Sequence, residues 1–181
     1  MNTEYEVRIL DIDVDQVRKK IEDLSATFEW DLVQKRYVYD FIPKVDSKWI
    51  RLRTNGIKST LTVKNLVSSE IDGTQELEIE VDDFEKTNMI LNELGYQAKG
   101  YQENRRIQYT FKGVEIDIDY WPMIPTYLEI EASSEDEVFE IVKMLGFQKS
   151  DCTSRDVKGI YLDYGYSLDE IYELKLEEER K

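Results

Sequence analysis

The chain has 181 residues, 41% of them hydrophobic and 12% aromatic, which is enough to form the core of a single folded domain. Its net charge of −15 argues against non-specific binding to nucleic acid or to anionic membranes. It contains no histidine, which excludes a histidine base, a Ser-His triad and histidine-ligated zinc, and its single cysteine, Cys152, excludes an intramolecular disulfide.

The first half of the chain reads as strands with one helix. The predicted elements are a strand at 3–11, a helix at 13–27, a long strand at 30–42, and strands at 48–54, 57–66 and 74–82. Apolar residues at helical spacing, from Val14 to Leu24, indicate the helix. Pro43 ends the long strand, and Asn55-Gly56 is the turn signal of a hairpin.

The second half alternates helices and strands. The predicted elements are a helix at 84–94, strands at 100–112, 114–121 and 126–132, a helix at 134–145, and short helices in the tail from Thr153. Gly95 and Gly146 stop the first two helices, because glycine adopts the left-handed conformation of a helix C-terminus. Asp136 and Glu137 lie in the first turn of the helix at 134–145, where the helix dipole favours acids.

About eight strands, mostly antiparallel, predict an α+β fold. We expect a closed antiparallel eight-stranded β-barrel with helices packed outside, which leaves interior room for side chains or one small ligand. The chain shows no linker-like segment, so we expect a single domain over residues 1–181, with a core at about 3–147 and a C-terminal helical segment at about 153–181.

Charged residues share one face of most predicted strands. The sets that alternate within one strand are Glu4, Glu6 and Arg8; Arg51 and Arg53; Glu76, Glu78 and Glu80; Glu115, Asp117 and Asp119; and Glu129 and Glu131. The residues between them are apolar, as in Ile50 and Leu52 or Ile116 and Ile118. This predicts an inverted barrel, with its apolar face outward against the helices and its charged face inward.

A solvated outer face is the alternative explanation for such alternation, and it accounts for most single strands. It is weakened here because the pattern recurs in five strands and because arginines dominate one strand while carboxylates dominate others. A barrel interior with charges of both signs is costly unless it holds a polyionic ligand. A triphosphate with divalent metal ions meets that description.

The charged motifs resemble those of a known family. Glu4-x-Glu6-x-Arg8 is similar to the Glu-x-Glu-x-Lys signature of the CYTH superfamily, the triphosphate tunnel metalloenzymes, which include class IV adenylate cyclases, thiamine triphosphatases and inorganic tripolyphosphatases. The further positions that resemble family motifs, in the family's order, are Arg51-x-Arg53, Lys64, Glu78-x-Glu80, Arg106, Asp119 and Glu129-x-Glu131. The segments WIRLRTNG and DYWPMIPTYLEIE look most like bacterial members described as candidate class IV adenylate cyclases.

Three positions depart from the family pattern. Arg8 stands where the family has lysine, and a planar guanidinium is not equivalent to a compact ammonium. Asn104 stands where many members have the lysine of a Lys-x-Arg pair, and Arg105 is a candidate to compensate. Ile124-Pro125 replaces a Leu-Gly pair. These departures bear on the substrate more than on the existence of the site.

The resemblance implies a site with two kinds of residue. The cations expected to be catalytic and to bind phosphate are Arg8, Arg51, Arg53, Lys64 and Arg106, with Glu78, Glu80 and Arg105 as further substrate-binding residues. The residues expected to hold one or two Mg²⁺ or Mn²⁺ ions are Glu4, Glu6, Glu129 and Glu131, with Asp119 as a further ligand or an orienting group. Carboxylate oxygens suit these hard cations.

Three functions remain open at this stage. We expect phosphoanhydride hydrolysis of a triphosphate, because attack by water asks less of the site than cyclisation does. A class IV adenylate cyclase, which makes cyclic AMP and pyrophosphate from ATP, is the alternative, and a non-catalytic module that binds polyphosphate or nucleotide is the third. The expected partner is ATP, tripolyphosphate or thiamine triphosphate, with no nucleic acid and no membrane, and a homodimer stays open.

The expected location is the cytoplasm. The N-terminus lacks the apolar run of a signal peptide, and no stretch approaches the length of a membrane span. The single cysteine fits a reducing compartment.

Overall fold

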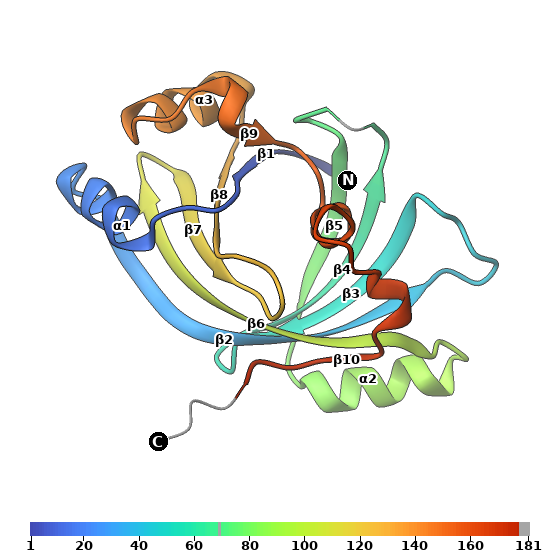
Figure 1. Cartoon of the computed structure of the whole chain (residues 1–181). Coiled ribbons are helices and arrows are strands. Elements are labelled where there is room, and N and C mark those ends of the chain that lie inside the picture. The colour runs from blue at the N-terminus through green and yellow to red at the C-terminus, as the bar shows by residue number, and fades with distance from the viewer. Residues whose placement is uncertain (69, 178–181) are drawn as a thin grey trace.

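A computed structural model, which describes residues 1–68 and 70–177, has a closed barrel of eight antiparallel strands (Figure 1). The barrel strands are β1 (Asn2–Ile9), β2 (Thr27–Asp40), β3 (Lys48–Thr54), β4 (Ser59–Leu66), β5 (Thr74–Val81), β6 (Ala98–Phe111), β7 (Val114–Tyr120) and β8 (Tyr127–Ala132). Their order around the barrel is β6-β2-β3-β4-β5-β1-β8-β7, and pairing of β7 with β6 closes it. The predicted α+β barrel is confirmed.

Four α-helices lie outside the barrel in the described part of the chain. They are α1 (Val14–Asp23), α2 (Phe84–Glu93), α3 (Glu135–Met144) and α4 (Val157–Asp163). Asp13, Asp83 and Ser134 cap the first three, each accepting a hydrogen bond from a backbone N–H three residues on. Gly95 and Gly146 end α2 and α3 with φ values of +92° and +78°, as predicted. None of the helices described is long and apolar enough to cross a membrane.

The main apolar core lies between the outer surface of the barrel and two helices. Val7 on β1, Ile116 on β7 and Ile130 on β8 are buried against Ile21 of α1 and Ile141 of α3. Figure 1 shows α1 and α3 together over this side of the barrel, with α2 on the opposite side. This arrangement confirms that the apolar face of these strands points outward, which leaves their charged face for the interior.

A smaller core forms where α2 covers β2 and β3, with Tyr39, Leu52 and Leu91 buried together. The predicted helix cover does not extend to the middle of β5. Leu77 and Ile79 are each 57% exposed, so the expectation that helices cover them is wrong. The reason is that α1 and α3 pack over β1, β7 and β8, and α2 packs over β3.

The first helix is shorter than the sequence pattern predicts. It ends at Asp23 rather than at 27, and Ser25 has a φ of +59°, a left-handed conformation that reverses the chain. Thr27 then starts β2, three residues earlier than predicted. The β-branched threonine favours a strand, and pairing with Thr110 on β6 fixes it there.

The tail is less helical than predicted. The short strand β9 (Cys152–Thr153) pairs with β1, and α4 and a 3₁₀ turn at Leu168–Glu170 follow. Residues 173–174 then form β10, which pairs in parallel with β6, so the predicted helix is wrong there. The last residues of that predicted helix, 178–181, lie outside the described residues. Leu174 is buried against Trp121, and this tertiary contact overrides the local helical pattern.

Candidate active site

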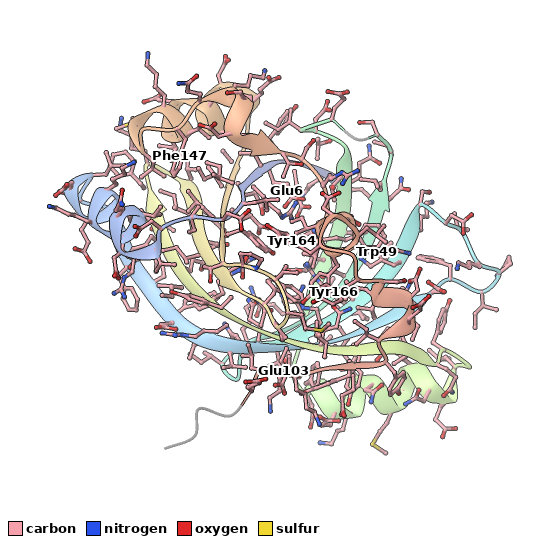
Figure 2. The ribbon with its side chains drawn as sticks, viewed as in Figure 1. Glu6, Trp49, Glu103, Phe147, Tyr164 and Tyr166 are labelled. Carbon is pink, nitrogen blue, oxygen red and sulfur yellow. The ribbon has the colours of Figure 1, made fainter. Side chains whose placement is uncertain are left out.

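Charged side chains from the eight strands line a cavity of about 190 Å³ inside the barrel. The predicted site residues that line it are Glu4, Glu6, Arg8, Arg51, Arg53, Lys64, Glu78, Arg106, Glu129 and Glu131. Figure 2 shows Glu6 within the barrel and Phe147 outside it, beside α3. The shared inner face that strand alternation predicts is therefore present, and the two charge types meet in one enclosed space.

Arg106 on β6 is held by three carboxylates. Its guanidinium donates to Asp119 at 2.6 Å and to Glu129 at 2.8 Å, and it also pairs with Asp117. Asp119 accepts a further bond from Asn104 at 2.8 Å. Asp119, a predicted metal ligand or orienting residue, thus contacts Arg106 and Asn104 in this structure.

Arg8 on β1 makes three separate contacts in the same interior. Its Nε lies 2.7 Å from Glu129, one Nη donates to Glu6 at 2.9 Å, and the other donates to the backbone carbonyl of Arg155 at 2.7 Å. The planar fork reaches all three acceptors at once, whereas a compact lysine ammonium has a different geometry. The departure from the family lysine thus ties the barrel to the chain that follows β9.

Lys64 and Arg51 form the next part of the inner wall. Lys64 lies 2.9 Å from Glu4 and 3.1 Å from Glu76. Arg51 lies 3.6 Å from Glu76 and 3.4 Å from Glu78. The carboxylates therefore hold these cations in place on the inner wall.

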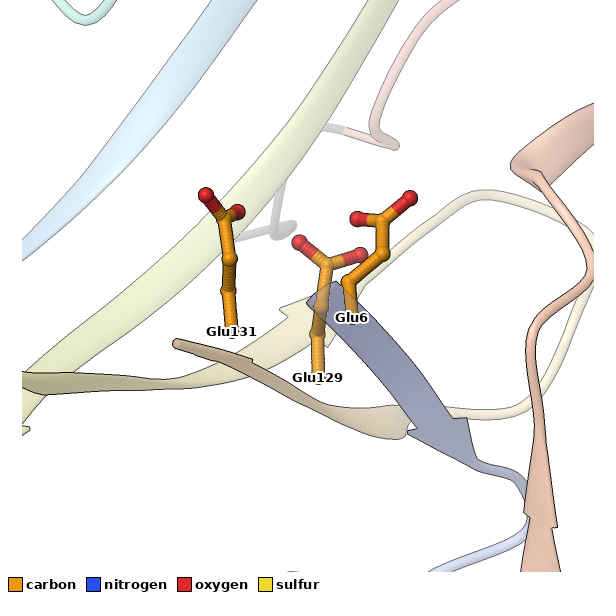
Figure 3. A group of neighbouring side chains, drawn as sticks. All are labelled: Glu6, Glu129 and Glu131. Carbon is orange, nitrogen blue, oxygen red and sulfur yellow. The ribbon is translucent and has the colours of Figure 1, made fainter. Parts of the chain in front are cut away.

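Three carboxylates gather on two paired strands. Glu6 on β1 lies opposite Glu131 on β8, and Arg8 lies opposite Glu129. Figure 3 shows Glu6, Glu129 and Glu131 pointing to one side of these strands, and one oxygen of each lies within 4.8 Å of the others. Three carboxylate oxygens at this spacing are a donor set that fits a hard divalent cation.

The surroundings shift the pKa of these acids in opposite directions. Burial, together with the neighbouring Glu4, Glu6 and Glu129, raises the pKa of Glu131 well above its usual range. Burial also raises the pKa of Glu4 to about 7, against the opposing effect of Lys64. Glu129 is buried too, but Arg8 and Arg106 hold its pKa well below the usual range.

Asp117 behaves like Glu131 in spite of its contact with Arg106. Burial raises the pKa of Asp117 to about 8, and the neighbouring Asp119 and Glu129 add to this effect. The interior therefore contains acids that a nearby cation stabilises and acids that lack enough positive charge. Of the second group, Glu131 belongs to the three carboxylates whose spacing fits a metal ion.

We expect the metal-free protein to lose stability as the pH rises. Glu4 and Asp117 have ordinary pKa values of 4.5 and 3.8 and folded values of about 7 and about 8. Because the folded state binds more protons than the unfolded state, the stabilising contribution is complete below the ordinary values and is lost as the pH rises through the folded ones. Melting temperature measured in EDTA across this range checks the prediction.

A metal ion reverses part of this trend, because it replaces the proton as the carboxylates' positive partner. Melting curves with and without Mg²⁺ or Mn²⁺ are therefore expected to diverge most at the alkaline end. Parallel curves, or rising stability in EDTA over the same range, would contradict the prediction.

A second cavity of about 540 Å³ adjoins the first. The residues that line both are Glu6, Arg8, Arg36, Arg51, Lys64 and Val157. Its other walls combine apolar side chains, including Trp49, Leu66 and Leu168, with lysines. It has room and apolar surface for an organic group next to the charged interior.

Two predicted substrate-binding residues do not join the others. Arg105 points to the outer surface, where it is 42% exposed, pairs with Asp31 at 2.6 Å and lies over Tyr120. Glu80 lies at the rim of the barrel and pairs with Lys58, with its side chain 72% exposed. Strand alternation explains the position of Arg105, because its neighbour Arg106 faces the interior and successive side chains point to opposite sides.

The prediction missed several charged residues that lie with the site. Glu76 pairs with Lys64, Asp117 pairs with Arg106, and Arg36 on β2 lines both cavities. Glu76 and Asp117 belong to the alternating charged sets of their strands, so strand alternation already places them on the inner face. Arg36 lies between the uncharged Gln34 and Val38 on its face of β2, so it forms no alternating charged set, and the pairing with β6 locates it.

Comparison with solved structures supports the fold. A Pyrococcus horikoshii protein, PH1012, is 24% identical, with a TM-score of 0.74 over 84% of this chain and 96% of its own. A candidate adenylate cyclase from Vibrio parahaemolyticus is 13% identical, with a TM-score of 0.76 over 89% and 98%. A candidate adenylyl cyclase from Hippeastrum, described as having a dominant triphosphatase activity, is 18% identical, with a TM-score of 0.59 over 93% and 98%.

Among curated protein sequences, none matches this chain. The family model of the CYTH domain matches residues 2–155, which include all eight barrel strands and leave out α4 and the segment after it. Since the match covers most of the chain and agrees with the resemblance of its charged motifs, the chain belongs to the CYTH domain family.

Proposed function

We propose that this protein is a divalent-metal-dependent enzyme that hydrolyses a phosphoanhydride bond of a triphosphate inside the barrel. The observation that carries the proposal is the joint presence, in one enclosed cavity, of a cluster of cations and a group of three carboxylates. A ligand that is itself a polyanion with bound cations satisfies both groups at once, whereas an uncharged ligand satisfies neither.

The cations hold the phosphates. Arg51, Arg53, Lys64 and Arg106 all line the cavity, and guanidinium groups offer paired donors to phosphate oxygens. Phosphoryl transfer depends mainly on positioning and on stabilising negative charge, so this chain performs it without histidine.

The carboxylates hold the metal. Glu6, Glu129 and Glu131 are the residues that we expect to bind Mg²⁺ or Mn²⁺, with Glu4 close by. When bound, such an ion neutralises phosphate charge and lowers the pKa of a bound water. Glu4, with a pKa of about 7, is suited to hold or release a proton near neutral pH.

Binding of metal and of phosphate is expected to be coupled. In the structure, Lys64 pairs with Glu4, and Arg8 pairs with Glu6 and Glu129. A triphosphate would attract these cations away from the carboxylates, and Glu6 and Glu129 would then be free to hold a metal ion, which would supply the positive charge that the acids lose. Each ligand therefore strengthens the other, by thermodynamic linkage.

Adenylate cyclase activity is the second candidate, and the larger cavity favours it. An organic group attached to the triphosphate fits beside Trp49 and Leu66 while its phosphates reach Arg51 and Lys64, which line both cavities. ATP is such a substrate, and so is thiamine triphosphate. The Hippeastrum protein, a candidate cyclase described as having a dominant triphosphatase activity, has the same fold, which supports ranking hydrolysis first.

The test is a product assay with ATP, thiamine triphosphate and tripolyphosphate, each with Mg²⁺ and with Mn²⁺. We expect orthophosphate release that depends on metal, and a joint rise in melting temperature with metal and tripolyphosphate that exceeds the sum of the separate rises. EDTA and a heat-inactivated sample are the controls.

Other outcomes separate the alternatives. Cyclic AMP with stoichiometric pyrophosphate from ATP would assign the cyclase. Triphosphate binding without any product would assign a binding module. Absence of both binding and turnover would overturn the proposed site.

A further inference from the structure

Arg36 is a buried cation that differs from the others in the cavity. It is only 7% exposed, yet within the described residues no carboxylate lies within 4.0 Å of its guanidinium. Its contacts are neutral: it donates to Asn104 and to Gln34, and it lies 4.6 Å above the ring of Trp121. In the part of the chain that the structure describes, its Nε has no hydrogen-bond partner.

A buried charge without a counter-charge destabilises a fold. Neighbouring charged groups add to the cost, since Arg51, Arg53 and Arg106 all lower the pKa of Arg36 along with burial, while Asp119 opposes them. By contrast, Arg8 and Arg106 each have carboxylate partners. Such an arrangement is expected where an anion completes the site.

The position of Arg36 indicates which anion. It lines both the charged cavity and the larger cavity, so it lies where the two meet. We infer that Arg36, held by Asn104, binds a phosphate group of the substrate at this junction. The inference rests on the proposed function, because it takes the substrate to be a triphosphate that extends from one cavity toward the other.

Asn104 explains why the cation comes from β2. The CYTH family often has lysine at this position, and here Asn104 instead accepts from Arg36 and donates to Asp119. Gln34 lies opposite Asn104 in the β2–β6 pairing, and Arg36 lies two residues further along β2, opposite Gln102. The positive charge of the lysine that β6 lacks at position 104 is thereby supplied by Arg36 on the neighbouring strand.

The experiment measures tripolyphosphate affinity by titration calorimetry in EDTA, where metal-dependent turnover is absent. We expect Arg36→Gln to weaken binding about tenfold or more, since it removes charge-assisted hydrogen bonds. Lys35→Gln is the matched control, because it removes one cation from the adjacent, outward-facing position of the same strand, and its affinity is expected to stay within about twofold of wild type.

A charge-relocation variant tests the role of Asn104. Arg36→Gln combined with Asn104→Lys returns the charge to β6 and is expected to recover most of the lost affinity. Without ligand, Arg36→Gln is expected to melt no lower than wild type, because it removes an unpaired buried charge. A purely structural role predicts the opposite: a lower melting temperature with unchanged affinity.

The outcomes separate this inference from the proposed function. Weaker binding in Arg36→Gln, with no turnover by wild type on any triphosphate, would support the phosphate position and overturn the enzyme. Metal-dependent turnover with unchanged affinity in Arg36→Gln would overturn the inference and leave the proposed function standing. A wild type that does not bind tripolyphosphate would also overturn the inference. Arg36→Met carries the same expectation and replaces the glutamine variant if that variant does not fold.

Discussion

Glu131→Gln and Glu6→Gln are each expected to reduce metal-dependent turnover by at least about 100-fold, since loss of even an outer-shell partner costs 10–100-fold. Both carboxylates belong to the group of three whose oxygens lie within 4.8 Å of one another. A neutral amide preserves the shape of the side chain but removes the negative charge that binds a divalent cation. Steady-state rates over a range of Mg²⁺ and Mn²⁺ concentrations measure the effect.

Glu131→Gln is not expected to lose stability along with activity. Glu131 has a raised pKa because of burial and three neighbouring glutamates, so its removal relieves repulsion, and the melting temperature in EDTA should not fall. Glu80→Gln is the matched control, since Glu80 pairs with the exposed Lys58 at the rim, and its turnover should match wild type. Retained turnover in Glu131→Gln or Glu6→Gln would mean that the metal binds elsewhere.

Arg106→Gln is expected to lower the free energy of unfolding by about 3–5 kcal/mol, because it leaves buried carboxylates without their cation. Arg106 contacts all three of Asp117, Asp119 and Glu129, and Asp119 is fully buried. Urea denaturation at neutral pH measures the loss. Lower pH should restore part of it, since protonation removes the charges that Arg106 balances in the wild type.

Two further variants identify the cause. Adding Asp119→Asn to Arg106→Gln should recover part of the stability, because Asp119 is fully buried and its carboxylate loses its cation when Arg106 is removed. Arg105→Gln is the control, since the adjacent arginine faces solvent and pairs with Asp31, and we expect a change of about 1 kcal/mol or less. Equal destabilisation by Arg105→Gln and Arg106→Gln would show that the interior network contributes little.

Strand periodicity determined much of the fold in advance. Charged residues alternating with apolar ones, as in Glu129-Ile130-Glu131, locate strands and assign their two faces, because successive side chains point to opposite sides. Local turn chemistry added the boundaries, as at Gly95 and Gly146, where positive φ values favour glycine. These signals depend only on residues near one another in the chain, so they can be read from it directly.

The exceptions lie where distant contacts override the local pattern. The tail has a helical pattern at 171–177, but Leu174 is buried against Trp121 and the chain pairs with β6 instead. Leu77 and Ile79 alternate like covered positions, yet they remain exposed. Whether a helix covers a strand depends on where the connecting loops direct it, and periodicity carries no such information.

For the charged interior, too, the sequence decides some features and the tertiary structure decides others. By itself, the sequence determined that Glu6, Arg51, Glu129 and Glu131 share the inner face of a barrel, because that follows from alternation within each strand. Only the tertiary structure decided that Arg36 joins them, since its position depends on the register between β2 and β6. It also decided which acids lack a compensating cation, because burial and ion pairing arise only when the barrel closes.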